Sequence, residues 1–304
     1  TMIKVAVAGA AGKMGRETVR SILEAPDLKL VAAIGHRQGI GQDVGELIGV
    51  SQTGVTLSAD LSRALQESGA EVCVDFTTPE AGAANARVIL EQGVRLVLGT
   101  TGFTAAELAN LDRVARERGI GGVIAPNFAL GAILMMQFAA QAARIFPDVE
   151  IIETHHKRKL DAPSGTARRT AELVAQARAE SGNWAAAAAS TGTGTQEQPA
   201  VELSAGLTGV ESDGTASTAT EMAAGGQPSR GLLCSGVPIH SLRIPGVVAR
   251  QEVVFGFAGQ TLRIIHESTD RTSFMPGVLF AIRRSMELYG LANLEDLMAV
   301  VLRP

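Results

Sequence analysis

The sequence predicts an α/β protein in which a Rossmann-like, doubly wound parallel sheet is joined to an α+β domain with a mostly open mixed sheet. Short apolar runs alternate with helix-like segments from residue 3 to about residue 128, which is the pattern of strands and crossover helices in a parallel sheet. A glycine-rich turn separates the first apolar run from the first helix-like segment, as is common in this class. Three β-like runs follow one another between residues 237 and 266, which indicates a second sheet.

Composition and charge predict a soluble globular chain. The 304 residues are 46% hydrophobic, which supports a full-sized core, and the net charge of -4 argues against a nucleic-acid partner. No apolar run approaches the roughly 20 residues of a membrane span. Because the first strand begins without a signal-peptide layout, we expect a cytoplasmic location or an equivalent soluble compartment. Cys73 and Cys234 lie far apart, so we expect buried thiols and neither a disulfide framework nor a metal site.

The glycine turn indicates a dinucleotide site. Residues 3–8 are predicted to form a strand, and a helix is expected from the turn to about Ala25. Gly9, Gly12 and Gly15 give the spacing G-x-x-G-x-x-G, which departs from the common G-x-G-x-x-G. Between a strand and a helix, such glycines allow the backbone to approach a pyrophosphate at the helix N-terminus. The alternative is a tight turn with a purely structural role.

The end of the second strand bears on the choice of cofactor. The strand is expected at 28–34 and is followed by Gly35, His36 and Arg37. A site that prefers NAD usually has a carboxylate here to bind the adenine ribose. Since this chain has two cationic candidates instead, we predict a preference for NADPH over NADH. The alternative for Arg37 is an exposed loop position.

Polar residues follow the later strands of the predicted parallel sheet. Three more strands are expected at 72–76, at 95–98 and within the segment 122–128, with helices ending near residues 91 and 118. Thr100, Thr101 and Asn127 come after two of these strands. Because ligands bind at the carboxyl ends of such strands, these side chains are candidates to contact a nicotinamide and its ribose. Ordinary use in turns is the alternative for each.

An apolar helix and a new strand lead into the second domain. The helix is expected from Leu130 to Ile145, and we expect Met135, Met136 and Phe138 to lie in the core. The strand at 149–153 then delivers a basic stretch. We place the second domain at residues 130–270, after a dinucleotide-binding domain that begins with residues 1–129.

The basic stretch precedes a helix start. His155-His156-Lys157-Arg158-Lys159 is followed by Ser164, Gly165 and Thr166, and the pattern from Ala167 to about Ala179 is helical. Ser164 or Thr166 can cap this helix, whose N-terminal amides would then bind an anion. An imidazole and an ammonium beside such a pocket can bind a carboxylated substrate and move a proton. The alternative is a solvated basic loop before a capped helix.

The stretch from Glu153 to Ala167 resembles the E-x-H-H-x-x-K-x-D-A-P-S-G-T-A signature of the 4-hydroxy-tetrahydrodipicolinate reductase family, also called dihydrodipicolinate reductase. The opening G-x-x-G-x-M-G-R, G-T-T-G-F at 99–103 and A-P-N-F at 125–128 resemble the same family in the same order. The resemblance implies NAD(P)H-dependent reduction of 4-hydroxy-tetrahydrodipicolinate to tetrahydrodipicolinate, a small dicarboxylate, in diaminopimelate and lysine biosynthesis. It also implies a homotetramer.

The resemblance further implies the roles of individual residues. The catalytic pair would be His155 as acid–base residue and Lys159 as proton donor. The substrate-binding residues would be His156, Ser164, Gly165 and Thr166. The cofactor contacts would be Gly9, Ala10, Ala11, Gly12, Lys13, Met14, Gly99, Thr100, Thr101, Ala125, Pro126, Asn127 and Phe128, to which the residue pattern adds His36 and Arg37. Lys157 and Arg158 are expected to face solvent.

These residue types suit the implied reaction. Hydride addition at C4 builds negative charge on the ring's enamine system, and C3 must then take a proton. A nearby ammonium or imidazolium stabilises that charge and can deliver the proton. The residues alone leave open whether His155 or Lys159 protonates C3.

Residues 181–230 depart from the usual pattern of the resembled family. Of these 50 residues, 32 are Ala, Gly, Ser or Thr, which favours a flexible low-complexity excursion. Residues 185–189 could instead extend the preceding helix, and 201–203 could form a short strand. Trp184 is expected to be a packing anchor.

The remaining segments are expected to complete both domains. Strands are predicted at 237–243, 247–257 and 260–266, and helices at 275–289 and 293–302. The second sheet would be covered on one face by its own helices and, as the resemblance implies, on the other by neighbouring subunits. His240 and Arg243 either line the mouth of the active site or lie in an interface. The resemblance also implies that residues 271–304 return to the dinucleotide-binding domain.

Two other classes of protein share the first domain. A different NAD(P)-dependent small-molecule dehydrogenase would have a differently placed Lys/His pair or a catalytic cysteine. A non-enzymatic dinucleotide sensor would keep the glycine turn without needing an acid–base pair.

Overall fold

The computed structural model describes residues 2–36, 38–181 and 230–301 of the chain. Contacts divide the chain into two compact units, one made of Thr1–Leu134 with Ser268–Pro304 and the other of Met135–Glu267. The first boundary lies within helix α6 (Leu130–Ala143). In the part of the chain that the structure describes, no helix is both long enough and apolar enough to cross a membrane.

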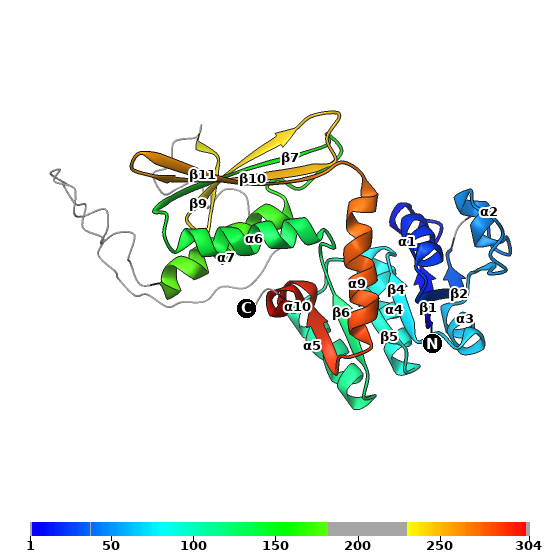
Figure 1. Cartoon of the computed structure of the whole chain (residues 1–304). Coiled ribbons are helices and arrows are strands. Elements are labelled where there is room, and N and C mark those ends of the chain that lie inside the picture. Colours follow the sequence, from blue (N-terminus) through cyan, green and yellow to red (C-terminus); the bar gives the residue numbers. More distant parts are fainter. Residues whose placement is uncertain (1, 37, 182–229, 302–304) are drawn as a thin grey trace, which may run out of the picture. The chain divides into compact units, whose positions relative to one another are not determined.

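The first unit contains a seven-stranded parallel sheet (Figure 1). Its order is β12-β6-β5-β4-β1-β2-β3. The strands are β1 (Ile3–Ala8), β2 (Leu28–Ile34), β3 (Leu57–Ser58), β4 (Val72–Asp75), β5 (Arg95–Leu98), β6 (Gly121–Ile124) and β12 (Gly290–Asn293). The chain runs outward from β1 in both directions, so the order reverses between β1 and β4, where sheets of this type bind their ligands.

Helices cover both faces of this sheet. On one face α1 (Lys13–Glu24) contacts α9 (Met275–Ser285), and on the other α3 (Leu61–Ser68), α4 (Pro79–Glu91) and α5 (Ala105–Glu117) lie in a row (Figure 1). The remaining helices are α2 (Val44–Ile48), α10 (Leu294–Val301) and the short 3₁₀ helix η2 (Arg271–Phe274). Fully buried β1 residues, such as Val5 and Val7, lie between the two layers. This arrangement confirms the predicted doubly wound fold.

Three short elements between β2 and β4 were not predicted from the sequence. They are α2, β3 and α3. Their caps are nevertheless visible in the sequence: Asp43 accepts from the Gly45 amide at 2.7 Å, and Asp60 accepts from the Arg63 amide at 3.0 Å. Gly49 and Gly69 end the two helices in the left-handed conformation, which favours glycine.

The C-terminal segment also differs from the prediction. The helix expected at 275–289 ends at Ser285, and β12 (Gly290–Asn293) then joins the sheet beside β6 before α10 begins at Leu294. Gly290 has a φ of +84°, a conformation that glycine adopts without strain. The strand is short and contains no β-branched residue, so only its pairing with β6 defines it.

The second unit contains a five-stranded mixed sheet of order β11-β10-β7-β9-β8. Its strands are β7 (Asp148–His155), β8 (Leu232–Cys234), β9 (Val237–Arg243), β10 (Ala249–Phe257) and β11 (Gln260–Ser268). β7 pairs in parallel with β9 and antiparallel with β10. Helices α6 and α7 (Gly165–Glu180) lie along one face (Figure 1). The predicted mixed sheet is confirmed, and β8 is an addition to it.

Burial corrects one core prediction. Met135 and Met136 are buried, but the side chain of Phe138 is 45% exposed. Because α6 is apolar on nearly all sides, its sequence does not show which face meets the sheet. Cys73 and Cys234 are buried thiols outside any disulfide, as predicted, and burial raises the pKa of Cys73. The predictions for Trp184, 185–189 and 201–203 fall on residues outside the described part of the chain.

Candidate active site

The glycine turn after β1 is held tightly against β2 and α1. The amides of Gly9 and Ala10 both donate to the Ile34 carbonyl, at 2.9 and 3.0 Å, and the Gly12 amide donates to the Gly9 carbonyl at 2.8 Å. Gly9 has a φ of +81°. A Cβ atom on Gly15 would lie 2.1 Å from the Gly9 carbonyl oxygen. The turn can therefore lie this close to α1 only because Gly9 and Gly15 are glycines.

The N-terminus of α1 is open to an anion. Gly12 is the N-cap and supplies no side-chain hydrogen bond, and the first turn contains no acidic residue. The first amides of a helix have no intrahelical acceptor, so those of Lys13 and Met14 suit the pyrophosphate of a dinucleotide. The Ala11 carbonyl accepts a hydrogen bond from Arg16 Nε at 2.9 Å, which helps to hold the turn in place. The residues present at this turn fit the cofactor that the fold implies.

A buried carboxylate joins the ends of β4 and β5. Asp75 is fully buried and accepts hydrogen bonds from the Thr77 amide (2.8 Å), the Thr77 hydroxyl (2.6 Å), Asn85 (2.9 Å) and the Thr100 hydroxyl (3.2 Å). The Thr100 hydroxyl is thus already engaged by a protein acceptor. The sequence reasoning missed Asp75, although an acidic residue at the end of an apolar strand was a readable signal.

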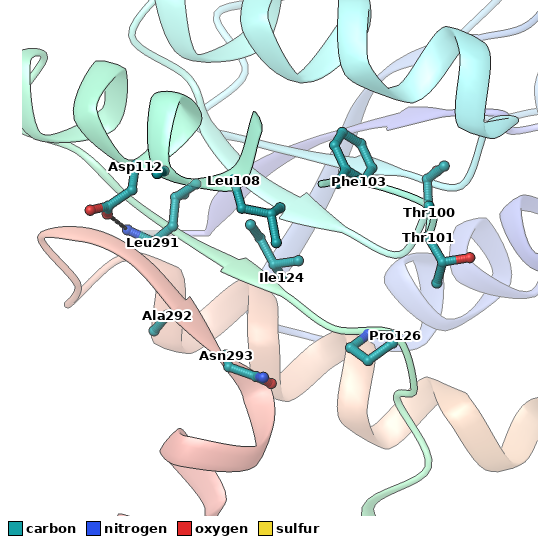
Figure 2. Close-up of a pocket in the computed structure, with 12 residues that line it drawn as sticks. Thr100, Thr101, Phe103, Leu108, Asp112, Ile124, Pro126, Leu291, Ala292 and Asn293 are labelled. Atoms are coloured by element: carbon teal, nitrogen blue, oxygen red, sulfur yellow. Dashed lines mark hydrogen bonds between the residues drawn. The ribbon is translucent and has the colours of Figure 1, made fainter. Parts of the chain in front are cut away.

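Three of the predicted cofactor contacts, Thr100, Thr101 and Pro126, line a cavity of about 470 Å³. Figure 2 shows Thr101 and Pro126 at one side of this cavity and the β12 residues Leu291, Ala292 and Asn293 at the other. Asp112 of α5 accepts from the Leu291 amide at 2.7 Å and so ties the edge strand to the cavity wall. The sequence did not predict that β12 lines this space.

The other predicted cofactor contacts in this region hold the loops that follow β5 and β6 in place. Phe128 is buried and packs edge-on against Phe76, with ring centroids 5.5 Å apart. A Cβ on Gly99 would lie 2.1 Å from the Phe76 ring, so Gly99 makes room for that ring. Asn127 accepts from the Ala129 amide at 2.9 Å, a turn-forming contact. Ala125 is buried, with its amide bonded to the Leu98 carbonyl at 2.9 Å.

The end of β2 is held in place by a neighbouring strand. Gly35 donates its amide to the Ser58 carbonyl at 2.9 Å, and His36 is exposed directly after it. Arg37, the second cationic candidate, lies outside the described residues.

In the second unit, β7 carries the predicted catalytic histidine at its last position. The strand extends to His155, two residues beyond the predicted end. Glu153 on the same strand is fully buried, and its Oε2 lies 2.5 Å from His155 Nδ1. Arg243, at the end of β9, forms two hydrogen bonds to this carboxylate, at 2.7 and 3.0 Å. The Ser164 amide approaches its Oε1 at 3.3 Å.

This arrangement keeps Glu153 ionised. Burial on its own would raise the pKa of Glu153, but the hydrogen bonds from His155, Arg243 and Ser241 outweigh burial and lower the pKa to about 2. A carboxylate that several donors satisfy keeps its charge even inside a protein. At neutral pH, His155 therefore faces a negative group that can only accept hydrogen bonds.

Lys159 is held close to the same cluster. Its Nζ lies 2.8 Å from Asp161 Oδ1, and its amide donates to the His156 carbonyl at 3.1 Å. Burial would raise the pKa of Asp161, but the hydrogen bond from Lys159 lowers it below its ordinary value. Lys157 and Arg158 are exposed, as predicted.

The predicted substrate-binding residues lie at the start of α7 and just before it. Ser164 is the N-cap, with its hydroxyl accepting from the Ala167 amide at 3.3 Å, and no acidic residue lies in the first turn, which contains Gly165 and Thr166. His156 Nδ1 is buried and has no hydrogen-bond partner among the described residues. A helix N-terminus and an unsatisfied imidazole nitrogen on the same segment suit a carboxylated ligand.

Comparison with known proteins identifies the family. The sequence pattern of dihydrodipicolinate reductase, N-terminus, matches residues 3–128, and that of dihydrodipicolinate reductase, C-terminus, matches residues 131–298. The chain belongs to the dihydrodipicolinate reductase family. This confirms the resemblance seen in the sequence motifs.

Individual relatives of this reductase family agree over nearly the whole chain. A 4-hydroxy-tetrahydrodipicolinate reductase of Listeria welshimeri is 44% identical over 97% of this chain and 100% of its own length. One from Moorella thermoacetica is also 44% identical, over 97% of this chain and 98% of its own. The solved structure of dipicolinate-bound dihydrodipicolinate reductase from Paenisporosarcina sp. TG-14 has a TM-score of 0.73 and 36% identity, covering 97% of this chain and 99% of that one.

His155 and His240 pair with different carboxylates of β7. Arg243 joins His155 through Glu153, whereas His240 Nε2 lies 2.7 Å from Glu150 Oε2 on the opposite side of β7. The structure thus places Arg243, and not His240, in the cluster of the reductase signature. Glu153 was visible in that signature, but its partner lies 90 residues away in the sequence.

Proposed function

We propose that this chain catalyses the NAD(P)H-dependent reduction of 4-hydroxy-tetrahydrodipicolinate to tetrahydrodipicolinate in diaminopimelate and lysine biosynthesis. One observation carries this proposal: relatives with this activity in their names are 44% identical over 97% of the chain. The first unit would bind the cofactor, and the second would bind the substrate and form the oligomer.

The activity can be tested directly. The purified protein is mixed with NADPH and the freshly made condensation product of pyruvate and aspartate semialdehyde, and NADPH oxidation is followed by absorbance. We expect oxidation that depends on both the protein and the condensation product. No oxidation by folded protein would contradict the proposal and favour a dinucleotide sensor.

The chain's own residues have separable tasks in this reaction. The reduced nicotinamide, when bound, supplies the hydride. His155 and Lys159 stabilise the negative charge that develops on the substrate ring, and one of them delivers the proton to C3. Glycines of the β1–α1 turn and the first amides of α1 would bind the pyrophosphate.

The substrate's two carboxylates require separate anchors. The first-turn amides of α7, with Ser164 as its N-cap, suit one carboxylate, and His156 or the cations of the basic stretch can bind the other. The Paenisporosarcina relative, whose structure contains dipicolinate, supports a small dicarboxylate as the ligand.

Gly165→Val is expected to raise KM for the substrate by about tenfold or more, since it blocks an anchor contact of roughly 1.4 kcal/mol or more. A Cβ on Gly165 would meet no protein atom within 4 Å. The added side chain therefore competes with a bound carboxylate and not with the fold. Steady-state kinetics and a thermal unfolding curve check this. An unchanged KM would contradict the placement of the anion pocket, and Gly165→Ala, with a smaller side chain, should have an intermediate KM.

We predict that kcat/KM is higher with NADPH than with NADH. No carboxylate follows β2 to repel a 2′-phosphate, and His36 is exposed there beside Arg37. Introducing a carboxylate with His36→Asp should shift the ratio toward NADH by about tenfold, through like-charge repulsion of the phosphate. Comparing kcat/KM for both cofactors checks the prediction, and a strong NADH preference of the unmodified protein would contradict it.

We also propose a homotetramer assembled through the sheet of the second unit. On the face away from α6 and α7, Thr154 pairs with Leu242, whose side chain is 41% exposed, and Ile265 of β11 is 52% exposed. Exposed apolar side chains on an open sheet favour a partner surface. Analytical ultracentrifugation tests the assembly, and a monomer at micromolar concentration would contradict it.

We also propose a cytoplasmic location, which cell fractionation tests.

A further inference from the structure

Glu153 is an unusual residue for its position in β7. The alternating residues Val149 and Ile151, on the same face of the strand, are buried and apolar, and Glu153 continues this row with no exposed side-chain surface. Burying a carboxylate is costly unless hydrogen bonds compensate. A valine or isoleucine would satisfy the packing alone, so the carboxylate requires a different explanation.

Each oxygen of Glu153 is occupied. Oε2 meets His155 Nδ1 at 2.5 Å and Arg243 Nη1 at 3.0 Å. Oε1 meets Arg243 Nη2 at 2.7 Å and the Ser164 amide at 3.3 Å. One buried carboxylate therefore connects the proposed catalytic histidine, the end of β9 and the N-cap of α7.

We propose that Glu153 is a positioning residue that fixes the tautomer of His155, so that Nδ1 carries hydrogen and Nε2 exchanges the proton. The proposal rests on the catalytic role proposed for His155. An ionised carboxylate can only accept, so the ring nitrogen that faces it must donate. Nε2 has no hydrogen-bond partner among the described residues. The same carboxylate stabilises the imidazolium once Nε2 has gained a proton.

Arg243 completes this arrangement. Its guanidinium pairs with Glu153 in a two-pronged contact, which keeps the carboxylate from taking the proton of His155 Nδ1. Arg243 Nη2 also donates to the Asp161 carbonyl at 2.6 Å, and the Asp161 carboxylate holds Lys159 Nζ at 2.8 Å. The Glu153–Arg243 pair thus positions both groups proposed to act on the substrate.

The test is Glu153→Gln, which keeps the shape and removes the charge. We expect kcat to fall by about 10²–10⁴-fold, because an amide group can present NH₂ to Nδ1 and so admits the wrong tautomer. ¹⁵N NMR of the substrate-free protein reads the tautomer directly. In the unmodified protein, neutral His155 should carry its hydrogen on Nδ1, and in the variant a mixture with the Nε2 form should appear.

Glu150→Gln is the matched control. Glu150 lies on the same strand and also pairs with a histidine and an arginine, His240 and Arg230, but it is partly exposed. We expect its kcat to stay within about twofold of the unmodified value, because Glu150 pairs with His240 and Arg230 and not with His155 or Lys159, and we expect the His155 tautomer to be unchanged.

Two results would overturn the proposal. One is an unmodified protein whose neutral His155 carries hydrogen on Nε2, a measurement that needs no variant to fold. The other is a folded Glu153→Gln variant with lower kcat but an unchanged tautomer, which would make the role merely structural. Because the NMR experiment contains no substrate, a failure of the proposed reductase activity would leave its outcome interpretable.

Discussion

Lys159→Ala and His155→Ala are each expected to lower kcat by about 10²–10⁴-fold, the usual loss when an acid–base or electrostatic group is removed. The negative charge formed on the substrate ring would lose either the ammonium or the imidazolium that stabilises it. Lys159 is 25% exposed and His155 15% exposed, so neither truncation leaves a large cavity in the core. Steady-state kinetics at saturating NADPH and substrate would measure the loss.

The chain supplies matched controls for this pair. Lys157 and Arg158 are exposed in the same basic stretch, so Lys157→Ala and Arg158→Ala change the local charge without touching the Glu153 cluster. We expect both controls to keep kcat near the unmodified value. Full turnover in both the Lys159 and the His155 variants would show that the catalytic assignment is wrong. Loss in only one of them would assign the larger catalytic contribution to that group.

The parts of the fold that sequence could predict are those with local signals. The β1–α1 glycine turn and the helix start at Ser164 both follow from neighbouring residues. The strand β12 could not be predicted in this way, because it has four residues and takes its conformation from pairing with β6. α2 and α3 were a different case, since Asp43 and Asp60 were readable N-caps.

The candidate site shows the same division. The sequence motif placed His155 and Lys159 on one stretch, but the partner of Glu153 depends on which strand lies beside β7. Arg243 aligns with His155 because β9 pairs in parallel with β7, and long-range register of this kind is not encoded locally. For that reason the sequence left Arg243 between two alternatives. The prediction that Phe138 lies in the core is wrong for a related reason, because the sequence of a helix that is apolar on nearly all sides does not show which face is buried.

Gly15→Ala is expected to destabilise the first unit by about 3 kcal/mol, at the upper end for overpacking, and to weaken NADPH binding by about tenfold or more, equal to about 1.4 kcal/mol. The new Cβ would lie 2.1 Å from the Gly9 carbonyl oxygen and 2.7 Å from its carbon. These are backbone atoms, so α1 or the turn must move. Either movement displaces the amides of Lys13 and Met14 from the pyrophosphate. Thermal unfolding and NADPH titration measure the two effects.

Gly165→Ala separates this clash from the general effect of adding a methyl group at a helix start. Gly165 is the first residue of α7, and a Cβ there meets nothing within 4 Å, so the unfolding temperature should not fall and the NADPH affinity should be unchanged. Gly15→Ala with unmodified stability and unmodified NADPH affinity would show that the turn can relax. That result would contradict the prediction that the contact between Gly15 and Gly9 sets the position of the amides at the start of α1.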